Sequence, residues 1–557
     1  MKKTLSRLIA LCVMLCLCAP ALAEGPTDPL LNEIGSTPIV KEPVTLSMGV
    51  AQSTAVLDYE ENYTTKWMEE MTGVKIEYEL FPATDAETKL DLLVNSGSEL
   101  PDILTFGIDD TRRYNYGQAG VLIPLNEYYE TMGQPFFDYC EEIGVDGNEV
   151  LRQVVSADGN YYGAPFYDYN YNNLYSLRAF INKTWLDKLG LQAPTNSEEL
   201  VQVLTAFRDQ DPNGNGQADE IPMLGCTKAW NADALGYLMN MFIYYNGDDN
   251  CYLPLNETGG KVDVAYDKPE YREFLKYANM LVKENLLSSL SFTQDSSQFS
   301  VTMSADPPVA GILVTGGANE LYFGNSPDEY IPFEAMKGPE GKQYYTTFAP
   351  DAYACSAITS YCEHPEIAFA YIHYTYNDEK AYEGQIIKRY GEEGVNWRYA
   401  EEGEISMLDD QGLKPFLYVI ETCWGVPTDK NLQGVWLSNV IDPNKLLEVY
   451  DGNPDNTEYQ YARNYVMNKD HGIPFDQLVT CLIYTQEETD RWMDQRTALR
   501  EYVKEARTLF AMGQMDPNND SDWEQYLQEL NNLQYKEILS TDQTAFERTR
   551  GTAAANE

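Results

Sequence analysis

Histidine is scarce in this 557-residue chain, which holds only His364, His373 and His471. A Ser-His-Asp triad or a histidine-rich metal centre would have to be assembled from these three residues, so neither kind of catalytic site is expected. The sequence also lacks a glycine-rich phosphate loop that opens a helix after a strand, which argues against nucleotide chemistry. No catalytic residue is singled out, and we predict a protein that is not an enzyme.

Positive charge is scarce as well. Lysine and arginine number 39 against 87 aspartate and glutamate residues, and the formal net charge is −48. A negative field of this size repels nucleic acid phosphates and anionic lipid surfaces, so neither is expected as a partner. A polyanionic ligand would need a local cluster of arginines to offset this field.

Cysteines at metal-binding or disulfide spacing are absent. Of the ten cysteines, Cys12, Cys16 and Cys18 lie in the N-terminal segment, and no C-x-x-C pair occurs anywhere. The remaining seven are an odd number and widely scattered, which indicates neither a zinc knuckle nor a disulfide framework, although one disulfide stays open. They are Cys140, Cys226, Cys251, Cys355, Cys362, Cys423 and Cys481.

A long apolar run occurs only near the N-terminus, from Leu8 to Cys18. It follows a positively charged start and precedes Ala21-Leu22-Ala23, a pattern that predicts a secretory signal peptide over residues 1–23. The three cysteines of this segment each follow a leucine, a poor fit to a lipid-attachment site. We therefore expect an exported protein that is extracellular, associated with the cell surface or periplasmic.

The composition of the rest of the chain is that of a globular protein. Apolar residues make up 43% and aromatic residues 12%, and the length exceeds what one ordinary core supports, so two or more lobes are expected. Residues 24–43 contain four prolines and few periodic apolar positions, which predicts a tether. The small and polar residues 550–557 predict a frayed tail.

The first periodic segments predict a strand–helix–strand unit. Apolar residues alternate over 44–48 and again over 74–80, while residues 59–71 carry a helical stripe that ends before Gly73. A helix over 87–95 and a short buried strand over 100–106 continue the pattern. Units of this kind build a mostly parallel sheet, so the predicted fold class is α/β.

Several motifs fall in the order found in one known family. The sequence SELPDI spans Ser98–Ile103, ADGNYYGAP spans Ala157–Pro165, and NKTWLDKLGL spans Asn182–Leu191, with Pro194-Thr195 and EEL following it. The helices predicted over 362–378 and from 523 to 548 are similar too. Over roughly residues 44–549 the chain resembles the extracellular solute-binding proteins of carbohydrate ABC transporters. Its length and an acidic loop resemble the oligosaccharide-binding subgroup, which includes alginate-oligosaccharide binders and large lipoprotein binders of Gram-positive bacteria.

The resemblance implies a two-lobed periplasmic-binding-protein-like fold of type 2 topology, with a hinge of crossing strands. It places the N-terminal lobe in residues 44–165 plus about 354–420, and the C-terminal lobe in 166–353 plus about 421–549. It also implies that a monomer holds a carbohydrate between its lobes, closes on it and delivers it to the permease subunits of an ABC transporter.

The acidic loop that begins at Asp211 predicts a calcium site. Oxygen-bearing residues alternate over residues 211–220, and Gly216 permits a tight turn, an arrangement that suits a hard cation with six or more oxygen ligands. The loop departs from the EF-hand pattern because its twelfth position is Pro222. The alternative is an Asn/Gly-rich turn without a metal. The expected ligands are the side chains of Asp211, Asn213, Asn215, Asp219 and Glu220 and the backbone carbonyl of Gln217.

Aromatic residues near predicted lobe crossings and strand ends are candidates for a carbohydrate cleft. The chain holds 42 tyrosines and 8 tryptophans, and sugars present flat C–H faces that pack on such rings. Trp185 and Trp523 lie in helical stripes and are expected in the core. For any one ring, packing in the core is an equal alternative. The candidates are Tyr167, Tyr169, Trp230, Trp397, Trp424 and Trp436.

Arg389 and Arg398 complete the candidate ligand-binding set, because an arginine can pair with the carboxylate of an acidic sugar. The favoured interpretation is that each pairs with a neighbouring acid instead. Two alternatives to transport stay open: a secreted polysaccharide-active enzyme, since a glycosidase needs only two suitably placed carboxylates, and a surface glycan sensor or adhesin.

Overall fold

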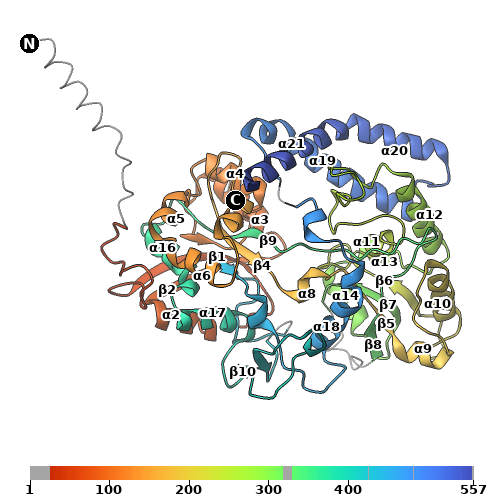
Figure 1. Ribbon diagram of the computed structural model, residues 1–557, viewed down its shortest axis with the longest axis horizontal. Helices are drawn as coiled ribbons and strands as arrows, with labels where there is room; N and C mark the ends of the chain where they lie inside the picture. Colours follow the sequence, from red (N-terminus) through yellow and green to blue (C-terminus); the bar gives the residue numbers. More distant parts are fainter. Residues whose placement is uncertain (1–25, 318–328, 424–425, 481, 555–557) are drawn as a thin grey trace, which may run out of the picture.

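The computed structural model describes residues 26–317, 329–423, 426–480 and 482–554. Two α/β lobes lie side by side, each built around its own sheet (Figure 1). Within these ranges, no helix is long and apolar enough to cross a membrane. The predicted signal peptide, residues 1–23, lies outside the described residues.

The first lobe contains a six-stranded sheet in the order β12-β4-β9-β3-β1-β2. β1 is parallel to its neighbours β2 and β3, whereas β9 is antiparallel to β3 and β4. Leu46, Met48 and Val50 of β1 are buried, which explains the alternation in the sequence. The strands are β1 (Val44–Gln52), β2 (Val74–Pro82), β3 (Ile103–Leu104), β4 (Ala164–Asp168), β9 (Asp351–Ile358) and β12 (Asn439–Val440).

Helix α2 (Tyr63–Thr72) of the first lobe is capped at both ends. It begins after Asn62, whose side chain accepts a hydrogen bond from the Thr64 amide. It ends at Gly73, where φ is 76°, so the predicted helix and its glycine cap are confirmed. The other helices are α3 (Ala86–Ser96), α4 (Asp110–Gln118), α5 (Asn126–Met132), α6 (Gln134–Glu142), α7 (Gly147–Gln153), α16 (Pro365–Ile372) and α17 (Glu379–Tyr390).

The second lobe contains a four-stranded sheet in the order β6-β7-β5-β8. β6 and β7 are parallel, and β5 is antiparallel to both of its neighbours. Trp185 is 1% exposed and packs edge-on against Phe207, and Trp523 is 9% exposed, which confirms both as core residues. The strands are β5 (Arg178–Asn182), β6 (Ile221–Leu224), β7 (Ala310–Thr315) and β8 (Tyr330–Pro332).

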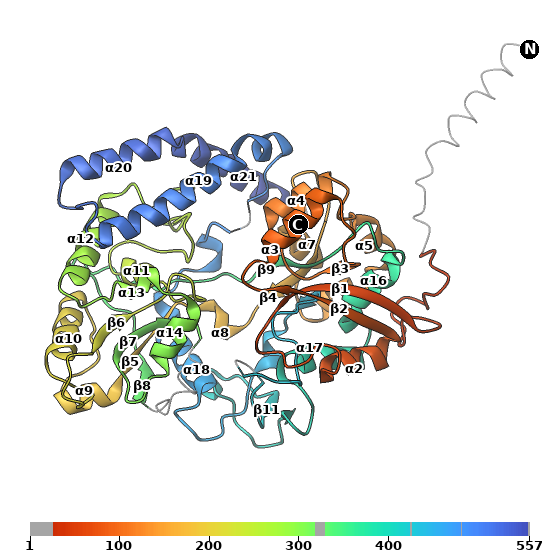
Figure 2. The ribbon, with the colours of Figure 1, turned by 180° about the vertical axis from the view of Figure 1, so that it is seen from behind.

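Helices surround the second sheet, and three long ones lie along one side of the lobe (Figures 1 and 2). The three are α19 (Gln486–Ala511), α20 (Asp520–Asn532) and α21 (Tyr535–Ala554). The others are α8 (Tyr171–Leu174), α9 (Lys183–Leu189), α10 (Ser197–Asp209), α11 (Ala234–Met239), α12 (Pro269–Lys283), α13 (Leu290–Thr293), α14 (Ser296–Met303) and α18 (Thr457–Asn468).

Two antiparallel strands carry the chain between the lobes. After β4 the chain passes through α8, which lies between the two sheets, and enters β5; it returns to the first sheet along β9 (Figure 2). The prediction of two α/β lobes joined by crossing strands is therefore confirmed. A two-stranded ribbon, β10 (Trp397–Tyr399) with β11 (Leu417–Val419), lies outside both sheets.

Three predicted segments differ from the structure. Residues 24–43 are not a free tether over their described part, because Leu31, Ile39 and Val40 are buried in the core of the first lobe. The tail expected to fray from Arg550 is helical as far as Ala554. Residues beyond 421, assigned to the second lobe, include β12, which pairs with β4 in the first sheet. The other lobe boundaries stay predictions.

The six described cysteines after the signal segment are free thiols, five of them buried, and Cys481 lies outside the described residues. The expected lack of a disulfide framework agrees with these six positions.

Candidate interlobe binding site

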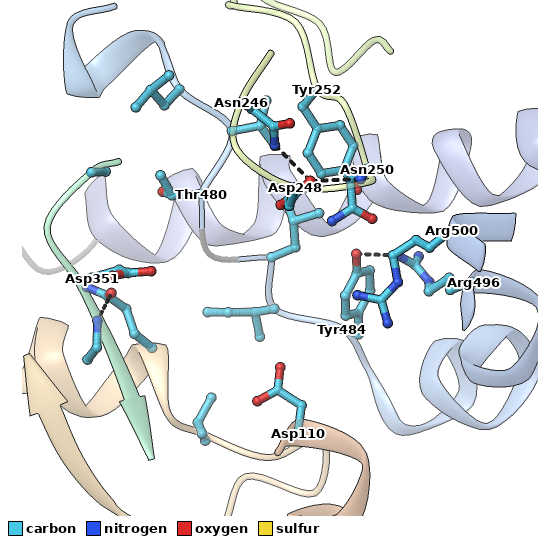
Figure 3. Close-up of a pocket in the computed structure, with 18 of the residues that line it drawn as sticks. Asp110, Asn246, Asp248, Asn250, Tyr252, Asp351, Thr480, Tyr484, Arg496 and Arg500 are labelled. Carbon is cyan, nitrogen blue, oxygen red and sulfur yellow. Dashed lines mark hydrogen bonds between the residues drawn. The ribbon is translucent and has the colours of Figure 1, made fainter. Parts of the chain in front are cut away.

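A cavity of about 620 Å³ lies between the two lobes, and we call it the interlobe cavity. The first lobe lines it with α4, the end of α7 and the start of β9. The second lobe lines it with the loop 246–253, with residues 478–480 and 482–484, and with α19 (Figure 3). Its size falls within the range of about 300–1,000 Å³ that is typical of small-molecule sites.

The second-lobe wall carries two tyrosines that one buried carboxylate holds in place. Asp542 of α21 is 3% exposed, and it accepts hydrogen bonds from the hydroxyls of Tyr252 at 2.8 Å and Tyr484 at 2.9 Å. The guanidinium of Arg496 also contacts both Asp542 and the Tyr484 hydroxyl. Because their hydroxyls are fixed from behind, the two rings are oriented before any ligand arrives.

The first-lobe wall is formed by the start of α4. Asp109 caps this helix by accepting from the amides of Thr111 and Arg112, and the cap fixes the next turn. Arg113 is 3% exposed and donates to Asp110 at 2.9 Å. The Tyr114 hydroxyl donates to Asp490 of α19 at 3.3 Å, a hydrogen bond that spans the lobes.

The floor of the cavity includes Asp351, at the start of β9. Asp351 keeps surface exposed, but protein atoms crowd its carboxyl group. The resulting loss of water raises the pKa of Asp351 to about 6, and the negative charge of Asp168 adds to the effect. Burial also raises the pKa of Asp168, although Asn173 and Arg389 oppose the shift.

The walls combine ring faces with hydrogen-bonding groups of both kinds. Tyr114, Tyr252, Tyr484 and Phe348 provide aromatic surface, and asparagine, threonine, aspartate and arginine side chains stand between them. A polyhydroxylated ligand needs both apolar stacking surfaces and many donors and acceptors. The cavity therefore suits a saccharide-like ligand.

Of the candidates predicted from sequence, those described lie outside the lining of this cavity. Tyr167 is half-buried against the first-lobe core and Tyr169 against the second-lobe core. Trp230 is 56% exposed and follows β6, with its ring over Gly316. Trp424 lies outside the described residues.

Arg389 and Trp436 are brought together, but in a different place. Both line a crevice of about 20 Å³ beside Phe166, whose ring centroid lies 5.1 Å from that of Trp436. Trp397 is fully buried and its indole nitrogen donates to the Gly391 carbonyl at 2.9 Å, so its assignment to a cleft is corrected to a core position.

Arg398 pairs with Glu404 through two hydrogen bonds of 2.9 and 2.7 Å. This is the pairing with a neighbouring acid that the sequence interpretation favoured. The residues that sequence reasoning missed, Tyr114, Tyr252 and Tyr484, carry one usable signal. Tyr114 follows the strand at Ile103–Leu104, and ligands of open α/β sheets bind beyond the carboxyl ends of strands.

The loop over residues 211–220 is closed by its own side chains. The Asp211 carboxylate accepts from the amides of Gly214 at 2.9 Å and Gly216 at 3.0 Å. Asp219 accepts from the side-chain amides of Asn213 and Asn215, at distances of 3.0 to 3.1 Å. The polar side chains thus point inward around one centre, and Gly214 and Gly216 have positive φ angles that permit the turn.

One oxygen of this loop has no partner: Glu220 Oε1 is buried and accepts no hydrogen bond. Burial and the nearby carboxylates of Asp211 and Asp219 raise the pKa of Glu220. Among the described residues, no group of three or more His, Cys, Asp or Glu side chains is arranged to hold a metal ion. A cation here would therefore depend on amide and backbone oxygens as well, a mixed set that fits Ca²⁺.

The chain is similar to known proteins both in sequence and in fold. The model of a family described as bacterial extracellular solute-binding protein matches residues 51–382. The fructooligosaccharide ABC transporter substrate-binding protein FusA of Streptococcus pneumoniae serotype 4 is 24% identical over 510 residues, which cover 88% of each chain.

Solved structures that are similar over 91% of this chain include two informative ones. One is the EF-hand mutant of S. pneumoniae FusA in complex with fructo-nystose, with a TM-score of 0.73, 22% identity and 100% of that chain covered. The other is the alginate-binding protein AlgQ2 without calcium ion, with a TM-score of 0.67, 20% identity and 99% covered. This likeness establishes the two-lobed periplasmic-binding-protein-like fold.

Proposed function

Since the chain belongs to the family of bacterial extracellular solute-binding proteins, we propose that it captures an oligosaccharide between its lobes and delivers it to an ABC transporter. The resemblance predicted from its motifs is thereby confirmed at the level of the family. The observation that carries the proposal is the interlobe cavity, with aromatic and polar side chains on the walls of both lobes. FusA, named for fructooligosaccharides, supports this ligand class.

Capture works by differential affinity for two arrangements of the lobes. A ligand in the cavity contacts α4 on one side and α19 on the other, contacts that an open arrangement cannot make together. The transporter's permease subunits would then recognise the closed lobes. The exported location, a monomeric state and the lobe boundaries other than the one corrected at β12 belong to the same proposal. So do Tyr167, Tyr169, Trp230, Arg389 and Trp436 as contacts in an open form.

The test is calorimetric titration of the protein from residue 24 onward with neutral and acidic oligosaccharides, paired with small-angle scattering. We expect binding of at least one oligosaccharide and a smaller radius of gyration in its presence. The variant Y114F, which removes the interlobe hydrogen bond to Asp490 but keeps the ring, should alter the compaction. Y361F, at an exposed tyrosine outside the cavity, is the matched control. Absence of heat with every oligosaccharide would refute capture, and release of new reducing ends would favour the enzyme alternative.

We also propose that the loop 211–220 holds a structural Ca²⁺ ion. The inward-pointing oxygens, the unpartnered Glu220 Oε1 and the mixed ligand set support it. The descriptions of the two similar structures, an EF-hand mutant and a form without calcium, support it as well. The ligands would be Asp211, Asn213, Asn215, Asp219, Glu220 and the Gln217 carbonyl. The ion would fix the loop between α10 and β6.

A further inference from the structure

Arg500 of α19 lines the interlobe cavity and, among the described residues, forms no ion pair or hydrogen bond. The other arginines of the cavity are engaged: Arg113 with Asp110, Arg152 with Glu149 and Arg496 with Asp542. Arg500 is thus the available guanidinium of this cavity.

The surroundings of Arg500 favour an anion at this point. Arg496 lies one helical turn away on the same face of α19, and its Nη2 atom is buried without a hydrogen-bond partner. Tyr484 stands beside both arginines, while Asp351 lies at the other side of the cavity (Figure 3). Arg496 is neutralised by Asp542, so the charge available to an anion comes from Arg500, and the Arg496 Nη2 atom adds a spare buried donor.

The acidic groups of the cavity do not neutralise Arg500. Asp110 is the partner of Arg113. Asp248 accepts from the Asn246 side chain at 3.0 Å and from the Asn250 amide at 2.7 Å, so it closes its own loop. Asp351, the third acidic residue of the lining, lies on the floor at the start of β9, on the opposite side of the cavity from Arg500 (Figure 3).

We propose that the ligand of the interlobe cavity is an acidic oligosaccharide, and that Arg500 pairs with a carboxylate on one of its sugar units. The proposal rests on the proposed function and narrows it to uronate-containing ligands. The planar guanidinium offers two parallel N–H donors that match the two oxygens of a carboxylate. The rings of Tyr252 and Tyr484 would pack on the sugar faces nearby, while Asp351 would accept from sugar hydroxyls.

The test compares ligands that differ only in charge. Oligomers of galacturonate and glucuronate, the same oligomers as methyl esters, and neutral gluco- and fructo-oligosaccharides are titrated calorimetrically into the full chain from residue 24. We expect an acidic oligomer to bind, and its ester to bind about tenfold or more weakly, because esterification removes the charge-assisted hydrogen bonds. Affinity for the acid should fall as salt rises.

Variants locate the effect. R500Q should weaken binding of the acidic oligomer by about tenfold or more and leave binding of the ester unchanged. R500K keeps the charge but loses the two parallel N–H donors, so its affinity for the acidic oligomer should lie between those of the native protein and R500Q. The control R491Q removes the same charge from the same helix, where Arg491 lies over Trp492 outside the cavity, and should change affinity by less than about twofold.

Three outcomes would overturn the inference. Equal affinity for acid and ester, an equal loss for both ligands in R500Q, or binding confined to neutral oligosaccharides would each exclude a carboxylate partner for Arg500. The last result would leave oligosaccharide capture intact. If no oligosaccharide of either kind binds, the proposed function itself fails, and this inference fails with it.

Discussion

Asp168 and Asp351 stand directly opposite each other on β4 and β9, the strands that carry the chain between the lobes. The Asp168 carboxylate accepts from the Asn173 side chain, while its Oδ1 atom is buried without a partner. Two carboxylates in cross-strand register repel each other when both are ionised. The hinge therefore carries a charge that depends on pH.

Replacing Asp351 with asparagine is predicted to remove part of that dependence. The pKa of Asp351 is about 6 in the folded protein, above that of an ordinary aspartate, so the folded state holds a proton that the unfolded state releases. Its contribution to stability is therefore greatest at low pH and is lost as pH rises through about 6. D351N should raise Tm relative to the native protein at pH 7.5 more than at pH 4.5, measured by thermal unfolding.

The matched control is D85N, at an exposed aspartate whose side chain makes no cap hydrogen bond. It should shift Tm equally at both pH values. A D351N effect that is also independent of pH would contradict the prediction.

His373 should make the stability of the protein depend on pH in the opposite sense to Asp351. It is 6% exposed, its Nε2 lies 2.9 Å from the Tyr129 hydroxyl and its Nδ1 lies 2.9 Å from the Phe369 carbonyl. Burial lowers its pKa to about 4, so the unfolded state binds the proton first. Stability should fall by up to about 3 kcal/mol as pH drops from about 6.5 to about 4.

Denaturant unfolding at pH 7 and pH 4.5 measures this loss. H373Q, which can still accept from Tyr129, should be less stable at pH 7 but show a weaker decline on acidification. H364Q, at a more exposed histidine away from Tyr129 and Phe369, is the matched control. An unchanged decline in H373Q would show that the buried imidazole is not its source.

Removal of calcium should lower the thermal stability of the protein. We expect a chelator to reduce Tm by several degrees and added Ca²⁺ to restore it, because an ion bound only by the folded state stabilises it by mass action. D219N and E220Q should weaken this response. D209N, at an exposed aspartate just before the loop, should keep it. A Tm that ignores both chelator and Ca²⁺ in the native protein would refute the site.

Gly338 is predicted to tolerate no side chain. A Cβ atom there would lie 1.6 Å from the Met241 carbonyl oxygen, so the backbone would have to move. G338A should destabilise the protein by about 2–3 kcal/mol. G341A, in the same turn, meets no neighbouring atom but has a φ of +81°, and should cost only about 1 kcal/mol. Chemical denaturation of the two variants compares them; an equal cost would contradict the steric account.

Local periodicity was sufficient for much of the fold. The alternation in β1 and the helical stripe before Gly73 are set by neighbours in the sequence, and both elements form where the pattern places them. The segment before residue 44 was misjudged, because proline content says nothing about the three apolar residues that the first lobe buries there. Tertiary packing, rather than local preference, decides such a segment.

The site was much less predictable. Trp397 has the residue type of a sugar platform, yet its indole is satisfied by a backbone carbonyl inside the core. Tyr252 and Tyr484 lie more than two hundred residues apart, and what joins them is Asp542, a third distant residue. Neither the composition of the sequence nor the spacing of its residues shows that these three side chains come together in the fold. The calcium loop could be proposed because all of its oxygens are local.

The hydrogen bond from Arg152 to the Thr549 carbonyl, 3.2 Å long, joins α7 of the first lobe to α21 of the second. The two lobes are therefore joined by this hydrogen bond as well as by the crossing strands. A rotation of the lobes that widens the cavity must either break the hydrogen bond or move α21 together with the first lobe. We therefore expect the hydrogen-exchange rate of the amide protons in the last turn of α21 to rise when the lobes open.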